Sequence, residues 1–162
     1  MKDKKKQKKV LFISSTGGHL SELLRLSPMF EKYDYFIITE KTKSNLGLKE
    51  IFPKKVGYLV YGTKHHMLTY PFVLLINCFI CLFVYIKHHP DYIVSTGAHV
   101  GGVMCLIGKI LGSKVIFIET FANINTKTAT GKLVYKFADK FIVQWDSMKD
   151  IYPNAIDGGW IF

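Results

Sequence analysis

Short apolar runs alternate along the chain with longer segments whose apolar residues recur at helical spacing. Runs of strand length occupy residues 9–14, 35–39, 56–61, 92–95, 114–119 and 141–144. Helical patterns occupy residues 19–30, 46–52, 67–87, 100–111, 131–137 and 147–152. Strands that alternate with helices are typical of a parallel sheet with right-handed crossovers and with helices on both faces. The pattern therefore predicts a single α/β domain.

One sequence pattern occurs twice, each time directly after a predicted strand. The first copy is STGGHL at residues 15–20, and the second is STGAHV at residues 95–100. In a parallel sheet both copies fall at the carboxyl ends of strands, which is the edge where ligands bind. Glycine lets the backbone approach a ligand, and the N–H groups that begin the next helix attract phosphate. We expect the two loops to bind two phosphates or one diphosphate; the alternative is a pair of tight turns capped by Ser or Thr.

Two histidines begin the helices that follow these loops. His19 and His99 stand where they can donate to a phosphate or act as an acid or a base. Gly101 and Gly102 extend the second copy and allow close packing of its helix on the sheet. Neither the G-x-x-x-x-G-K-[ST] nor the G-x-G-x-x-G phosphate motif is present, although Glu40 ends the second strand where a dinucleotide fold holds its ribose-binding acid.

The charge of the chain narrows the class of partner. Its formal net charge is +10, and residues 1–9 alone carry six lysines. An excess of positive charge favours an anionic partner, which is a nucleic acid, a phosphate-bearing substrate or an anionic lipid surface. Nucleic-acid interfaces usually add several arginines, and Arg25 is the only one here. We therefore expect a basic tail at residues 1–8, a folded domain at residues 9–162, and no nucleic-acid partner.

Residues 67–86 form an uncharged segment of twenty residues, MLTYPFVLLINCFICLFVYI. As a helix it reaches about 30 Å, the thickness of the hydrocarbon core of a bilayer. A spanning helix would put the strands at 56–61 and 92–95 on opposite sides of the membrane, although both belong to one predicted sheet. We therefore expect a crossover helix whose outer side lies on a partner protein or, as we favour, on a membrane surface. The alternative is a core helix that is buried on all sides.

Four stretches give the chain a resemblance to a known family. They are STGGHLSELLRL, PDYIVSTGAHVGG, KVIFIETFANINTKTATGKLVYKFADKFIVQW and YPNAIDGGWIF. Over residues 9–162 the chain resembles the membrane-associated, acceptor-side subunit of two-chain UDP-sugar glycosyltransferases. That group contains the subunit of the dolichol-pathway N-acetylglucosaminyltransferase and bacterial relatives in capsule and exopolysaccharide synthesis. More distantly the chain is similar to the amino-terminal half of the peptidoglycan lipid II N-acetylglucosaminyltransferase.

The resemblance implies a Rossmann-like domain that forms one half of a GT-B glycosyltransferase. This half binds a polyprenyl-diphosphate-linked sugar, and a separate donor-binding subunit holds most of the UDP-sugar. The residues that would bind the acceptor diphosphate are Thr16, Gly17, Gly18, His19, Thr96, Gly97, Ala98, His99, Gly101 and Gly102. The residues that would line the cleft between the subunits are Glu119, Thr120, Asn123, Asn125 and Thr126. Eukaryotic members begin with a membrane anchor, whereas this chain begins with lysines, so we expect peripheral attachment at the cytoplasmic face.

Inverting sugar transfer needs a base for the acceptor hydroxyl. His19 and Glu119 are the candidates; the alternatives are a phosphate donor for His19 and a loop cap for Glu119. No metal or cofactor is expected. The apolar end of the chain is expected to dock on the partner, through Trp160, Ile161 and Phe162. Two other functions remain open: a scaffold that only recruits a catalytic subunit, and a small Rossmann enzyme that acts alone.

Overall fold

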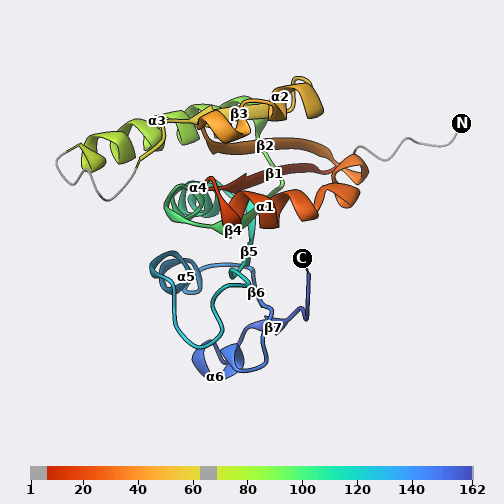
Figure 1. The fold of residues 1–162 in the computed structure, drawn as a ribbon, viewed down its shortest axis with the longest axis vertical. Helices are drawn as coiled ribbons and strands as arrows, with labels where there is room; N and C mark the ends of the chain where they lie inside the picture. The colour runs from red at the N-terminus through yellow and green to blue at the C-terminus, as the bar shows by residue number, and fades with distance from the viewer. Residues whose placement is uncertain (1–6, 63–68, 162) are drawn as a thin grey trace, which may run out of the picture.

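A seven-stranded parallel sheet organises the whole chain (Figure 1). The computed structural model describes residues 7–62 and 69–161. The order across the sheet is β3-β2-β1-β4-β5-β6-β7, and every neighbouring pair is parallel. The strands are β1 (Lys9–Ser14), β2 (Asp34–Glu40), β3 (Val56–Leu59), β4 (Tyr92–Gly97), β5 (Lys114–Ile118), β6 (Lys140–Val143) and β7 (Ile156–Asp157). The predicted single α/β domain with a parallel sheet is confirmed.

The seventh strand was not predicted from the sequence. β7 has only two residues, and its pairing with β6 joins Ile142 to Ile156 and Val143 to Asp157. A run this short shows no alternation of apolar and polar residues, so only the presence of β6 beside it makes it a strand. Ile156 and Asp157 therefore form one edge of the sheet.

The helices follow the predicted segments with two changes at their boundaries. They are α1 (Gly18–Arg25), α2 (Leu48–Ile51), α3 (Tyr70–His88), α4 (His99–Ile110), α5 (Ala129–Val134) and α6 (Met148–Ile151), with 3₁₀ turns η1 (Ser27–Lys32) and η2 (Lys43–Asn45). The predicted helix at 19–30 is two pieces, because Pro28 lies at the start of η1 and cannot continue an α-helical hydrogen-bond ladder. The segment predicted as one helix at 46–52 is likewise preceded by the separate turn η2.

Helices cover both faces of the sheet, as the alternating pattern predicts. On one face α1, η1 and α2 pack over Phe12, Ile37 and their neighbours. On the other face α3, α4 and α5 pack over Leu11, Ile93 and Phe117. Adjacent strand residues such as Leu11 and Phe12 enter opposite cores, since side chains alternate along a strand.

The apolar helix α3 is the crossover between β3 and β4, and both strands belong to one sheet. Only Asn77, Cys81 and Tyr85 are buried on it. The alternative of a helix buried on all sides is therefore wrong, because α3 lies at the outside of its layer with one face on the protein (Figure 1). The predicted start of this helix at 67–68, most of the basic tail and Phe162 lie outside the described residues.

Candidate functional site

The two copies of the repeated sequence lie side by side at the centre of the sheet. β1 and β4 are neighbours, and each runs into its own copy. The strand that follows β1 in the chain lies on one side of this pair, and the strand that follows β4 lies on the other. The strand order thus reverses between β1 and β4, which makes this the topological switch point where open α/β sheets bind ligands.

Direct hydrogen bonds join the two copies to each other. The Ser15 N–H donates to the Gly97 carbonyl at 2.8 Å, and the Ala98 N–H donates to the Ser15 hydroxyl at 3.2 Å. The Thr96 hydroxyl donates to the His19 carbonyl at 2.8 Å. The repeated residues therefore build one two-loop structure at the sheet edge.

The geometry of the loops needs glycine at two places. Gly17 and Gly97 have φ of 76° and 101°, which L side chains rarely adopt. A Cβ on Gly97 would also lie 3.1 Å from the His19 ring, whereas one on Gly17 or Gly18 would meet nothing within 4 Å. Neither α1 nor α4 receives a side-chain cap from the described residues. Both helix starts thus lie beside the glycine loops, at the place where open α/β folds bind phosphate.

Gly101 and Gly102 serve the packing of α4. A Cβ on Gly101 would lie 2.3 Å from the Ser95 hydroxyl, and one on Gly102 would lie 3.0 Å from a methyl carbon of Thr130. Both glycines are buried. The predicted close approach of this helix to the sheet is confirmed at Gly101. Both glycines lie on the buried side of α4, which packs on the protein.

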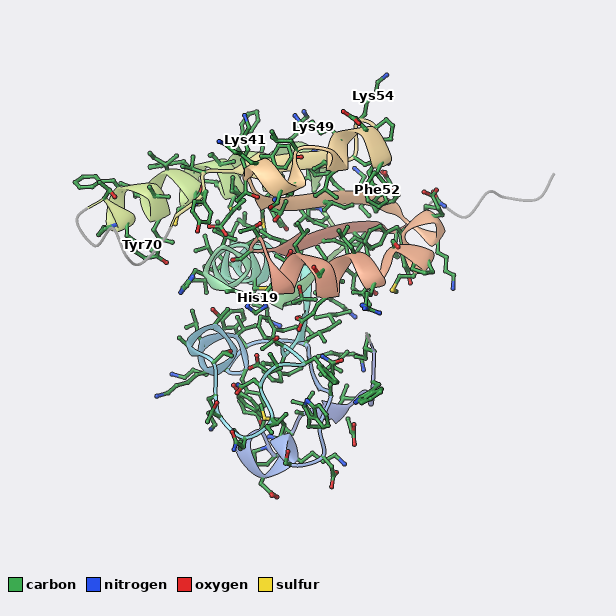
Figure 2. The ribbon with its side chains drawn as sticks, viewed as in Figure 1. His19, Lys41, Lys49, Phe52, Lys54 and Tyr70 are labelled. Carbon is green, nitrogen blue, oxygen red and sulfur yellow. The ribbon has the colours of Figure 1, made fainter. Side chains whose placement is uncertain are left out.

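His19, labelled at the start of α1 in Figure 2, lines a hollow of about 160 Å³ between the second loop, the end of β5 and the start of α5. The hollow is lined by His19, Gly97, Ala98, His99, Phe117, Glu119, Thr128, Ala129 and Thr130. The Nδ1 atom of His19 lies 2.8 Å from the Thr96 carbonyl. Because a carbonyl can only accept, Nδ1 carries the proton and Nε2 is the ring nitrogen left for a ligand.

Glu119 is a buried carboxyl at the end of β5 that reaches the same hollow. It accepts hydrogen bonds from the Thr128 hydroxyl at 2.9 Å, the Thr120 N–H at 3.0 Å and the Tyr152 hydroxyl at 3.2 Å. Burial raises the pKa of this carboxyl, and the three donors and the charge of His19 oppose the rise. Gly131 makes the arrangement possible, since a Cβ there would lie 2.1 Å from a carboxylate oxygen of Glu119.

Two further carboxyls belong to this region and were not assigned to it from the sequence. Glu40, at the end of β2, accepts from the Thr16 N–H at 3.4 Å and the Gly62 N–H at 3.3 Å, and burial raises its pKa. Glu22, on α1, accepts from the Thr120 hydroxyl at 2.7 Å. A signal for Glu22 was present, because it follows His19 by three residues and so shares its helix face. Glu40 ends β2, the strand next to β1, and it connects the first glycine loop at Thr16 to the segment after β3 at Gly62.

The polar loop after β5 lies at the same sheet edge, outside the hollow. Thr120 binds Glu22, and the Thr126 hydroxyl donates to the Asn123 side-chain carbonyl at 2.5 Å. The Asn123 amide also donates to the Thr126 carbonyl. Asn125 is exposed. The structure thus brings Thr120 to the site residues, while Asn123 and Thr126 close their own turn.

At the carboxyl end of the chain, Trp160 is 74% exposed, with its ring 5.6 Å from that of Phe121. The backbone N–H of Ile161 donates to the Gln144 side chain at 3.3 Å, and Ile161 packs against the core on the α1 side. Among the described residues, no group of three His, Cys, Asp or Glu side chains is placed to hold a metal ion.

Comparisons with known proteins identify relatives of the chain. The family model described as "Oligosaccharide biosynthesis protein Alg14 like" matches residues 62–161. The "UDP-N-acetylglucosamine transferase subunit alg14" of Schizosaccharomyces pombe is 28% identical over 176 residues, which cover 95% of this chain and 83% of the relative. The subunit of the same name from Mus musculus is 22% identical, and the match covers 91% of this chain and 80% of the relative.

Solved structures share the fold. MurG of Acinetobacter baumannii superposes with a TM-score of 0.69 and 18% identity, over 86% of this chain and 42% of MurG. A UDP-N-acetylglucosamine 2-epimerase from Rickettsia bellii superposes with a TM-score of 0.68 and 14% identity, over 93% of this chain and 43% of the epimerase. The chain thus spans less than half of each of these proteins, and its fold corresponds to the amino-terminal half of GT-B glycosyltransferases and epimerases.

Proposed function

Because this chain belongs to the family of Alg14-like oligosaccharide biosynthesis proteins, we propose that it is the acceptor-binding subunit of a two-chain glycosyltransferase. The reaction transfers a sugar from a UDP-sugar to a polyprenyl-diphosphate-linked saccharide. UDP-N-acetylglucosamine is the first donor to test, since the relatives are named as subunits of a transferase for that sugar. A separate donor-binding subunit is the partner, and capsule or exopolysaccharide synthesis is the setting that follows from the resemblance.

One observation carries this proposal: the two glycine loops are hydrogen-bonded to each other at the switch point of the sheet. Loops held together in this way present two helix starts to one ligand. A diphosphate carries two adjacent anionic groups, so it matches paired N–H sites better than a single phosphate does. The proposed contacts come from residues 16–19 and 96–99. Gly101 and Gly102 support this site by letting α4 pack closely behind it.

We assign the role of base to His19. Its Nδ1 proton is held by the Thr96 carbonyl, so Nε2 presents a lone pair to the hollow. Nε2 takes the proton of the acceptor hydroxyl as its oxygen attacks the anomeric carbon of the donor. The bond from that carbon to the phosphate oxygen breaks, and UDP leaves with the electron pair. Glu119, with three hydrogen-bond donors around it, orients a hydroxyl and the loop beside it.

The outer face of α3 supports peripheral attachment to a membrane. Its exposed apolar residues recur at helical spacing and are Phe72, Leu75, Ile76, Phe79, Leu82, Phe83 and Ile86. By length and composition α3 could cross a bilayer, but its other face packs on the sheet as a crossover. Lys41, Lys49 and Lys54 project near the β3 edge of the sheet (Figure 2). An exposed apolar helix on a chain with a net charge of +10 suits the interface of an anionic membrane.

The start of α3 connects this face to the site. The Tyr70 ring stands edge-on to the His99 ring, with centroids 5.8 Å apart. An acceptor whose lipid lies along α3 would therefore reach the second glycine loop without leaving the membrane surface.

The test uses membranes that contain this chain with its partner subunit or alone. Labelled UDP-N-acetylglucosamine is added, and label is counted in the lipid extract. We expect label only when both chains are present. Label with this chain alone would place the donor site here and contradict the division of roles.

The same assay with variants separates an enzyme subunit from a scaffold. His19→Ala should lower transfer on the order of 100-fold or more, since a general base contributes at least that much. His89→Ala is the matched control, because His89 follows α3 at the opposite edge of the sheet. Full activity of the His19→Ala complex would favour a scaffold that only recruits the catalytic subunit.

A further inference from the structure

Glu22 lies three residues after His19 on the same face of α1 and joins three parts of the site. One carboxylate oxygen, Oε1, accepts from the Thr120 hydroxyl at 2.7 Å and from the Phe121 N–H at 3.1 Å. Its side chain is 13% exposed. Oε1 therefore ties α1 to the loop that follows β5.

The second oxygen of this carboxylate has a different environment. Oε2 is buried and accepts no hydrogen bond from the described residues. It lies 3.8 Å from Nδ1 of His19. A buried carboxylate oxygen without a donor is unfavourable unless a positive group compensates it. The nearby group that becomes positive in the proposed reaction is the His19 imidazole.

We propose that Glu22 is a positioning residue for His19, a role that rests on the proposed function. When Nε2 takes the proton of the acceptor hydroxyl, the imidazole becomes a cation with protons on both nitrogens. The negative charge on Oε2 stabilises that cation from the Nδ1 side, while the Thr96 carbonyl holds the ring in place. Oε1 at the same time fixes the carboxylate against the loop, so Glu22 acts through His19 and does not touch the substrate.

Glu22→Gln isolates the part of Glu22 that faces His19. The Phe121 N–H can only donate, so the glutamine carbonyl stays on the loop and the amide nitrogen takes the place of Oε2. The variant thus keeps the connection to the loop and replaces a negative oxygen near Nδ1 by a neutral donor. Glu31→Gln is the matched control, since Glu31 lies on η1 and binds the Tyr35 hydroxyl away from the site.

The first measurement is steady-state transfer by the two-chain complex. We expect Glu22→Gln to lower kcat on the order of 10- to 100-fold with the acceptor KM within about threefold, because the charge acts only when the imidazole is protonated. Glu31→Gln should match the wild type. In the His19→Ala background, Glu22→Gln should change the residual rate by less than about twofold, because the group it acts through is gone.

Two results would overturn the inference: wild-type activity of Glu22→Gln, or an equal loss with and without His19. The second would show a structural role in holding the loop.

A second measurement does not depend on transfer. Imidazole ¹⁵N chemical shifts of His19, recorded where the ring is neutral, should show the proton on Nδ1 in the wild type and in Glu31→Gln. Glu22→Gln should increase the fraction protonated on Nε2, because its amide N–H faces Nδ1. Identical tautomer populations in the wild type and Glu22→Gln would contradict the positioning role. If the wild-type complex transfers no sugar, the proposed function fails and the tautomer comparison alone decides the role of Glu22.

Discussion

His19 and His99 occupy equivalent places in the repeated sequence, yet their rings have different surroundings. The His19 ring turns to the second loop and binds the Thr96 carbonyl, so it links the two copies. The His99 ring faces the first residue of α3, Tyr70. The difference arises because β1 and β4 are followed by helices on opposite faces of the sheet. The same residue type therefore joins the two loops in one copy and contacts the start of α3 in the other.

The carboxyl of Glu119 makes the stability of the domain depend on pH. Burial raises its pKa in the folded chain above its ordinary value of 4.5. A raised folded pKa means that the folded state binds the proton more tightly than the unfolded state does. The stability from this group is therefore fully present below the ordinary value and is lost as the pH rises through the raised one.

Two variants should change this dependence in opposite directions. Glu119→Gln removes the titration, so its free energy of unfolding should rise relative to the wild type between pH 4.5 and neutral. Tyr152→Phe removes a donor that stabilises the charged carboxylate. Its free energy of unfolding should therefore fall further below that of the wild type as the pH rises over the same range. Urea unfolding at several pH values measures both differences. Parallel curves for the wild type and Glu119→Gln would contradict the assignment of this dependence to Glu119.

At the scale of elements, α3 has an inner face that packs on the protein and an outer face of exposed apolar residues. The inner face carries Asn77, whose side chain donates to the Val60 carbonyl and accepts from the Val60 N–H, both at 2.9 Å. This pair of bonds fixes α3 to the chain directly after β3. A helix anchored in this way keeps its orientation, so its outer face presents one fixed apolar surface.

Removing two rings from this outer face should weaken attachment to membranes without unfolding the domain. Phe79 and Phe83 are 65% and 67% exposed. Phe79→Ser with Phe83→Ser should lower binding to anionic lipid vesicles on the order of 100-fold, since each buried ring contributes about 1.4 kcal/mol or more.

Ile51→Ser is the matched control for this pair, because Ile51 is 67% exposed on α2 and lies on the other face of the sheet. Co-sedimentation with vesicles measures binding, and thermal unfolding checks the fold. Vesicle binding of the double variant equal to that of the wild type would show that the outer face of α3 covers a protein.

At the scale of the whole molecule, the last strands and the candidate site are connected through aromatic side chains. Trp145 donates its indole N–H to the Phe121 carbonyl at 2.8 Å, and Trp160 stands against both rings. Phe121 in turn donates its N–H to Glu22. A partner that covers Trp160 would therefore lie next to the loop that contacts the site.

Removal of residues 159–162 should abolish co-purification with the donor-binding subunit. Trp160→Ala alone should weaken it, with a change in the free energy of unfolding of about 1 kcal/mol or less, because the side chain is mostly exposed. Pull-down of the partner together with urea unfolding of each variant gives both quantities. A folded deletion variant that still co-purifies would refute docking at this end of the chain.

The periodicity of the sequence determined most of the fold. Six of the seven strands and the six α-helices were predictable, because the strands are short apolar runs and the helices repeat apolar residues at helical spacing. The repeated loops were predictable too, since glycine and histidine directly after a strand have few structural uses. The helix break at Pro28 and the two-residue strand β7 were not predictable, because each involves too few residues to change the periodic pattern.

Tertiary structure alone decided what surrounds His19. Glu119 was predicted at the ligand edge, but its donors Thr128 and Tyr152 come from later segments that no local pattern connects to it. The hydrogen bonds between the two loops depend on β1 lying beside β4, which follows from the order of strands in the sheet. The sequence by itself identified His19 and Glu119 as candidates for the proposed chemistry. The packing decided which nitrogen of His19 is free and which carboxyls face it, because those properties belong to contacts between residues far apart in the chain.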